Sequence, residues 1–134
     1  MARPKAKELT QRELDIMHVF WQDGGELTAP DVRDRLADQG SDLAYTTVAT
    51  LVRILVEQEC LVQTNEQRPF SYKVARTFDE ISGRMLGDVL QRVFQGSREQ
   101  LLVRLFGQQK KLTASERAAL EQILHEQKRN QSDV

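Results

Sequence analysis

Two helix-start signals follow one another closely near the beginning of the chain, and each is closed by glycine. The first is a capping box in which Thr10 caps the helix, Glu13 reaches back and Gly24 ends the helix. The second begins at the cap Thr28 and stops at Gly40. Two short helices therefore follow each other closely, and the fold class depends on the element that comes after them.

That element is a third predicted helix within residues 43–62, LAYTTVATLVRILVEQECLV. Because a helix turns by about 100° per residue, its apolar and polar residues separate onto two sides. The apolar side is formed by Val48, Leu51, Val52 and Leu55, and the opposite side by Thr46, Ala49, Thr50 and Arg53. β-branched residues propagate a helix poorly, so a threonine cluster on the outer side needs an explanation.

The next stretch, CLVQTNEQRPFSYKVAR, alternates as two strands. We expect them over residues 61–64 and 70–75, joined by a polar turn over 65–68. Three helices and a β-hairpin predict a mainly α chain with a winged helix-turn-helix fold.

This fold offers an explanation for the threonines. Small hydroxyl side chains on the third helix let its backbone approach a duplex closely, and they can bond phosphates or base edges in the major groove. An alternative is that the threonines only start a surface helix and form local caps. The helix alone leaves both interpretations open, whereas the two preceding helices and the hairpin favour DNA binding.

Charge does not by itself indicate a nucleic-acid partner. The 134 residues carry a formal net charge of −1, and residues 1–76 hold ten lysines or arginines against twelve acids. DNA binding therefore requires the charges to be sorted by face. The acids gather around the first two helices, whereas basic residues lie at Arg3, Lys5, Lys7, Arg68, Lys73 and Arg76.

Nothing in the sequence indicates catalysis, a cofactor or a metal site. The single Cys60 excludes an intramolecular disulfide and a multi-cysteine zinc site, and His18 and His125 lie far apart without metal-ligand spacing. A glycine-rich phosphate loop, a nucleophile elbow and an HExxH motif are absent. No signal peptide or membrane span is visible, so we expect a cytoplasmic protein without direct membrane insertion.

Four stretches, taken in their order and spacing, resemble the penicillinase-repressor (BlaI/MecI) family of bacterial winged-helix transcriptional repressors, to which the copper-responsive CopY repressors also belong. They are LTQRELDIMHVFW with the following Gly24, TAPDVRDRL, YTTVATLVRIL and RPFSYKV. The resemblance implies a homodimeric repressor that binds double-stranded DNA. The third helix of each copy would enter the major groove of one half of a dyad operator, with the hairpin wing along the backbone.

Carried onto the matching positions, the resemblance implies a set of DNA contacts. Three threonines face the groove, a tyrosine stands at the helix entry, and two arginines contribute from the same face and from the wing tip. These residues are Thr46, Thr47, Thr50, Tyr45, Arg53 and Arg68. The chain departs from the family pattern at the end of the third helix, where ILVEQEC replaces a basic run that closes on glycine. We therefore expect weaker and less salt-dependent DNA binding than in a typical member.

The last third of the chain predicts three more amphipathic helices, in TFDEISGRMLGDVLQRVF, SREQLLVRLF and TASERAALEQIL. Helices of this length cannot bury their apolar faces alone, so pairing with a second copy is the expected solution. Packing back onto the N-terminal core is the alternative. We accordingly predict a winged-helix DNA-binding domain over residues 1–76 and a helical dimerisation domain over 77–134.

In the resembling family, a membrane sensor metallopeptidase triggers a cut between an asparagine and a phenylalanine in the middle C-terminal helix. The aligned pair here is Leu105 and Phe106, of which only the phenylalanine matches. This favours dimer-core packing of the pair over cleavage. The cysteine pairs of the copper-responsive branch are also missing, so metal-dependent release is not expected. A protein-interaction module and a ligand-gated regulator are the alternative functions.

Overall fold

The structure is a computed structural model that describes residues 8–107 and 111–132. It divides into two compact units, one ending at Leu86 and the other beginning at Gly87. The predicted basic residues Arg3, Lys5 and Lys7 lie outside the described residues.

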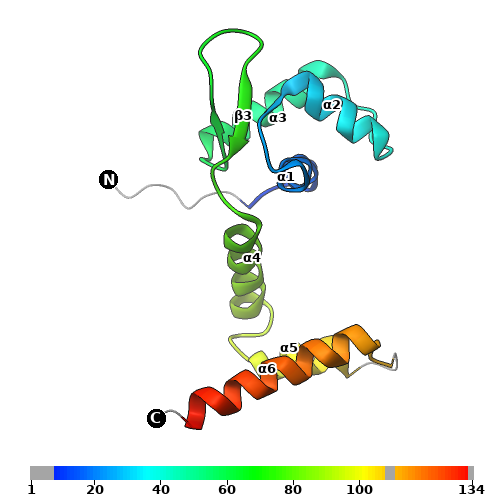
Figure 1. Ribbon diagram of the computed structural model, residues 1–134, viewed down its shortest axis with the longest axis vertical. Coiled ribbons are helices and arrows are strands. Elements are labelled where there is room, and N and C mark those ends of the chain that lie inside the picture. Colours follow the sequence, from blue (N-terminus) through cyan, green and yellow to red (C-terminus); the bar gives the residue numbers. More distant parts are fainter. Residues whose placement is uncertain (1–7, 108–110, 133–134) are drawn as a thin grey trace. The chain divides into compact units, whose positions relative to one another are not determined.

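The first unit is a winged helix. Three helices pack against a three-stranded antiparallel sheet (Figure 1). The strands of this sheet lie in the order β1, β3, β2. The helices are α1 (Gln11–Asp23), α2 (Ala29–Asp38) and α3 (Tyr45–Glu57), and the strands are β1 (Leu27–Thr28), β2 (Leu61–Gln63) and β3 (Ser71–Val74). The predicted helices and the predicted hairpin are thus confirmed, with strand ends that shift by one residue.

Local signals explain where the first helix begins and ends. The Thr10 hydroxyl accepts a hydrogen bond from the Glu13 amide at 3.2 Å, and the Glu13 carboxylate accepts one from the Thr10 amide at 2.9 Å. This is the predicted capping box. Gly24 ends the helix with a φ of 78°, a left-handed conformation that glycine adopts without steric cost.

The strand β1 is an element that the sequence did not predict. Leu27 pairs with Tyr72 and Thr28 with Ser71, so β1 adds a third strand to the hairpin. Two residues are too short to show an alternating pattern, and Thr28 also acts as the cap of α2. Only the distant pairing partner on β3 defines this strand.

A single apolar core holds the winged helix together, and all three helices contribute to it. Its largest fully buried side chains include Phe20, Ile16 and Met17 from α1, Leu36 from α2 and Leu55 from α3. Cys60 is also buried, and burial raises the pKa of its thiol. The cysteine is therefore a small core residue, as the sequence predicted.

Trp21 lies at the edge of this core and is half-buried. Its Nε1 donates a hydrogen bond to the carbonyl oxygen of Arg76 at 3.1 Å. Its ring meets those of His18 and Phe78 edge-on, with centroid distances of 5.2 and 5.4 Å. These contacts connect α1 to the segment in which the chain leaves the sheet.

The predicted boundary after residue 76 differs from the observed division after Leu86. Helix α4 (Phe78–Arg92) begins within the first unit, because Ile81 is buried in the winged-helix core and Met85 packs against it. The second unit contains the end of α4, α5 (Arg98–Phe106) and α6 (Ala114–Ser132). No helix that the structure describes is both long and apolar enough to cross a membrane.

The end of α3 has a Schellman motif with an acid at the position that glycine usually occupies. The Cys60 amide donates to the Leu55 carbonyl at 2.9 Å and the Glu59 amide donates to that of Val56 at 3.0 Å. Glu59 has a φ of 64° in this motif. A side chain in the left-handed region is disfavoured, so the sequence departure at ILVEQEC also carries a conformational cost.

We expect Glu59→Gly to raise the free energy of unfolding by about 0.5–1 kcal/mol. The lost ion pair with Arg76 offsets little of this, because its atoms are 3.8 Å apart and both side chains are substantially exposed. Urea denaturation followed by circular dichroism measures the change. Glu57→Gly, within α3, is the matched control and should destabilise. Equal effects of the two substitutions would contradict the conformational explanation.

Candidate nucleic-acid interface

Helix α3 has one buried side and one exposed side. Val48, Val52 and Leu55 are fully buried against the other helices and the sheet. The six residues predicted as DNA contacts are all exposed, five of them on α3 and one in the wing: Tyr45, Thr46, Thr47, Thr50, Arg53 and Arg68. The aliphatic side therefore fixes the helix, and the hydroxylated side remains available to a ligand.

The threonine hydroxyls of α3 differ in their hydrogen bonds. Thr50 Oγ1 donates to the carbonyl oxygen of Thr46 at 2.8 Å. Among the described residues, the hydroxyls of Thr46 and Thr47 have no partner. The N-cap of α3 is Ala44, and no side chain caps the helix start. No threonine therefore caps the start of α3, although the Thr50 hydroxyl is engaged locally.

The wing is fixed by hydrogen bonds across its turn. Asn65 Oδ1 accepts from the Ser71 amide at 2.9 Å, and Asn65 Nδ2 donates to the Pro69 carbonyl at 3.1 Å. Gln63 Nε2 donates to the Asn65 carbonyl at 2.7 Å. A single asparagine thus bridges both sides of the turn that presents Arg68.

Arg68 is supported by an aromatic ring and affects the pKa of the nearby Tyr72. Its Cζ lies 5.5 Å from the centre of the Phe70 ring, within cation–π range. Burial raises the pKa of Tyr72, the field of Tyr45 raises it further, and Arg68 lowers it. Tyr72 is therefore close enough to both Tyr45, at the start of α3, and Arg68, at the wing tip, for their charges to affect its pKa.

The basic residues of α2 differ from those of α3 and the wing in their ion pairs. The pairs on α2 are Arg33 with Asp34 at 3.4 Å and Arg35 with Asp23 at 2.9 Å. Within residues 8–107 and 111–132, Arg53, Arg68 and Lys73 form no ion pair. Arg53, Arg68 and Lys73 are therefore available to meet phosphates, although the chain as a whole is slightly acidic.

Lys73 was not among the predicted contacts. It is exposed on β3, between the half-buried residues Tyr72 and Val74. The alternation of RPFSYKV is the signal that indicates this outward position. Lys73 therefore joins the candidate interface as a further phosphate-contact residue.

Comparisons with known proteins identify the family of the chain. Residues 9–126 match the family described as penicillinase repressor. The chain belongs to this family. It is therefore a DNA-binding transcriptional repressor and not an enzyme.

Individual relatives of this repressor cover most of its length. The transcriptional regulator BlaI of Mycobacterium tuberculosis, in strains CDC 1551 / Oshkosh and ATCC 25618 / H37Rv, is 29% identical over 123 residues. That match covers 91% of this chain and 86% of the relative. The solved complex structure of hsRosR-SG matches with a TM-score of 0.54 at 14% identity, over 92% of this chain and 96% of that chain. At such low identity, the structural match shows a shared fold only.

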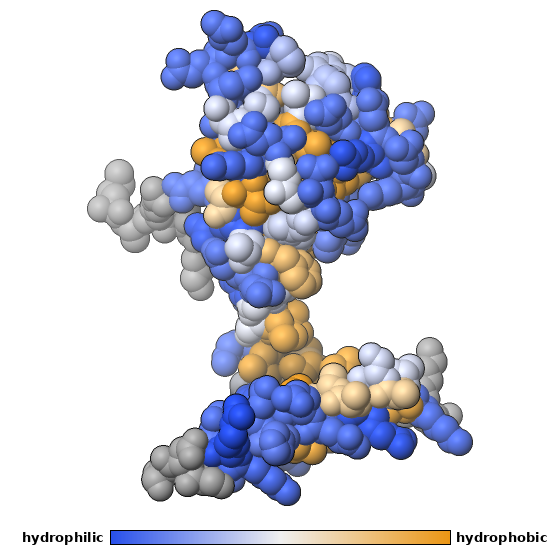
Figure 2. Space-filling view, in the orientation of Figure 1, coloured by the Kyte–Doolittle hydropathy of each residue, from blue (hydrophilic) through white to orange (hydrophobic). Residues whose placement is uncertain are grey.

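The second unit of the repressor has no buried side chain among its described residues. Its helices instead expose large apolar residues, namely Val89, Val93, Leu102, Val103, Leu105, Ile123 and Leu124. Figure 2 shows apolar surface on this part of the chain. Exposed apolar surface that gathers in one region often marks a protein–protein interaction site.

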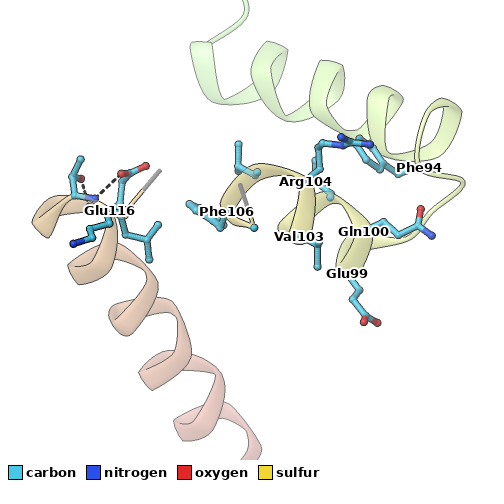
Figure 3. A pocket seen from close by; sticks show the side chains of 13 residues that line it. Phe94, Glu99, Gln100, Val103, Arg104, Phe106 and Glu116 are labelled. Carbon is cyan, nitrogen blue, oxygen red and sulfur yellow. Dashed lines mark hydrogen bonds between the residues drawn. The ribbon is translucent and has the colours of Figure 1, made fainter. Parts of the chain in front are cut away.

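The aligned pair Leu105 and Phe106 lies in the last turn of α5. Leu105 is 65% exposed, whereas Phe106 is half-buried. Both border an open groove between α5 and the start of α6, together with Phe94 (Figure 3). Packing of this pair in a dimer core, in preference to cleavage triggered by a membrane sensor metallopeptidase, stays a prediction.

Proposed function

We propose that this repressor acts as a homodimer that binds a dyad operator in double-stranded DNA. The winged helix of each copy places α3 in the major groove of one half-site, with the wing along the sugar-phosphate backbone. The helices of residues 77–134 hold the two copies together. The cytoplasm, where the DNA is, is the proposed location.

The two-sided α3 is the observation that carries the proposal. A helix that reads bases is anchored on one side, and small polar residues on its other side let its backbone approach the base edges closely. Val48, Val52 and Leu55 supply the anchor, and the hydroxyls of Thr46 and Thr47 are unengaged among the described residues. We assign Thr46, Thr47, Thr50 and Tyr45 to the groove.

The two arginines have different proposed roles. Arg53 projects from the exposed side of α3 and meets a phosphate or a base edge. Arg68, supported by the Phe70 ring at the wing tip, meets the backbone. Glu57 at the end of α3 is exposed and acidic, so it lowers the affinity through repulsion of the phosphates.

The exposed apolar residues of the second unit support the dimer. A unit without a buried core of its own gains stability when a second copy covers its apolar side chains. Two winged helices joined in this way can reach two half-sites about 34 Å apart.

Selection of duplexes from a random pool by the full-length protein tests the proposal. We expect the recovered sequences to contain an inverted repeat, bound with one dimer per repeat. Recovery of duplexes without any shared sequence would contradict it, as would equal affinity for the selected and the scrambled duplex.

We expect Arg53→Ala to weaken binding to the selected duplex by about tenfold. Fluorescence anisotropy at several salt concentrations measures the loss. A phosphate contact predicts a shallower salt dependence, whereas a base contact predicts relaxed specificity at one position. Arg129→Ala, near the end of α6, is the matched control and should leave affinity within twofold of the wild type. An unchanged affinity of Arg53→Ala would remove Arg53 from the interface.

A further inference from the structure

The exposed threonines of α3 do not offer a ligand the same chemical groups. A threonine hydroxyl has one hydrogen to donate, and in Thr50 this hydrogen is engaged by the Thr46 carbonyl at 2.8 Å. What Thr50 can offer a ligand is therefore its methyl group and the two lone pairs of Oγ1. Thr46 and Thr47, whose hydroxyls lack a partner among the described residues, can still donate.

A methyl group has one matching partner in the major groove. Among the four bases only thymine carries a methyl group there, at C5, and apolar contact with it is an established form of base readout. Thr50 lies on the exposed side of α3, and the preceding residue, the half-buried Ala49, adds no bulky or charged side chain beside it. The environment of Thr50 is thus suited to an apolar contact, although the residue is formally polar.

We infer that Thr50 is a specificity-determining residue that recognises thymine through its methyl group, and that its hydroxyl serves α3 itself. The inference rests on the proposed function, because it requires α3 to lie in the major groove. It names the base that each half-site presents at this position. The remaining lone pairs of Oγ1 offer a competing route, in which Thr50 would accept a hydrogen bond from an amino group of cytosine or adenine.

The two routes are separated by three substitutions at the same residue. Thr50→Val keeps the shape and the methyl group but loses the hydroxyl. Thr50→Ser keeps the hydroxyl and loses the methyl group, and Thr50→Ala loses both. Because Thr50 is exposed, none of these changes disturbs the core, and circular dichroism checks that each variant is folded.

The matching change in the DNA removes the methyl group of thymine. Thymines of the duplex selected by the wild-type protein are replaced one at a time by deoxyuridine, which removes only the C5 methyl group. We expect wild-type affinity to fall by about fourfold at one symmetric position per half-site. Thr50→Val, which keeps the methyl group, should still lose affinity when deoxyuridine is placed at that position. Because both copies in the dimer carry the change, Thr50→Ser and Thr50→Ala should bind the thymine duplex about fifteenfold more weakly and no longer respond to deoxyuridine at that position.

Two results would overturn the inference while leaving the proposed function intact. One is weak binding by Thr50→Val together with normal binding by Thr50→Ser, which would assign the contact to the hydroxyl. The other is wild-type affinity that no deoxyuridine substitution changes. If the wild-type protein binds no duplex at all, the proposed function itself fails, and this inference fails with it.

Discussion

Leu105→Asp is expected to convert the repressor into a monomer and to weaken its binding to a dyad operator by about 100-fold. Leu105 is 65% exposed on α5, in a unit without a buried residue in the described part of the chain. A carboxylate there must lose its hydration if a second copy covers α5. Each winged helix would then bind its half-site alone, without the high effective concentration that the dimer provides.

Sedimentation velocity and fluorescence anisotropy measure the two parts of this prediction separately. Leu105→Met, which keeps an apolar side chain of similar volume, is the control and should remain a dimer with wild-type affinity. Leu102→Asp, a change at another exposed position of α5, should repeat the effect of Leu105→Asp. A dimer that tolerates both aspartates would show that α5 is not part of the interface.

Phe20→Ala should destabilise the winged helix by about 3–5 kcal/mol. Phe20 is fully buried in the core that α1, α2 and α3 share, so its removal leaves a cavity that rigid neighbours cannot fill. A loss of this size is a large part of the stability of a typical domain. Urea denaturation at constant protein concentration measures it, with far-ultraviolet circular dichroism as the signal.

Phe78→Ala is the matched control for this prediction. The chemical change is the same, but Phe78 is 50% exposed and contributes mainly an edge contact to Trp21. We expect a loss of about 1 kcal/mol or less. Similar losses for the two substitutions would mean that the core around Phe20 collapses onto the cavity.

The helices of this protein could be predicted because their signals are local. The capping box of Thr10 and Glu13, the stop at Gly24 and the apolar stripe of α3 all lie within a few residues of the structure that they define. The strand β1 could not be predicted, since Leu27 becomes a strand residue only by pairing with the distant Tyr72. Likewise, the continuous pattern of α4 does not reveal which of its turns belongs to which unit.

Helical periodicity also predicted which side of α3 faces outward. It could not show that Thr50 donates to the Thr46 carbonyl, because the order of residue types does not reveal the orientation of a hydroxyl group. The acid Glu59 was interpreted only as a lost phosphate contact, whereas its left-handed backbone is visible only in three dimensions. The spacing of residues thus predicts which side chains are exposed. The structure adds which hydrogen bonds and backbone conformations these residues adopt.

The indole of Trp21 gives this repressor an intrinsic fluorescence signal. It is the single tryptophan of the chain, and its Nε1 donates to the backbone at Arg76, just before α4. Indole emission responds to the loss of a hydrogen bond and to solvent entry. Any rearrangement between the sheet and α4 during operator binding would therefore change the intrinsic fluorescence, without an attached dye.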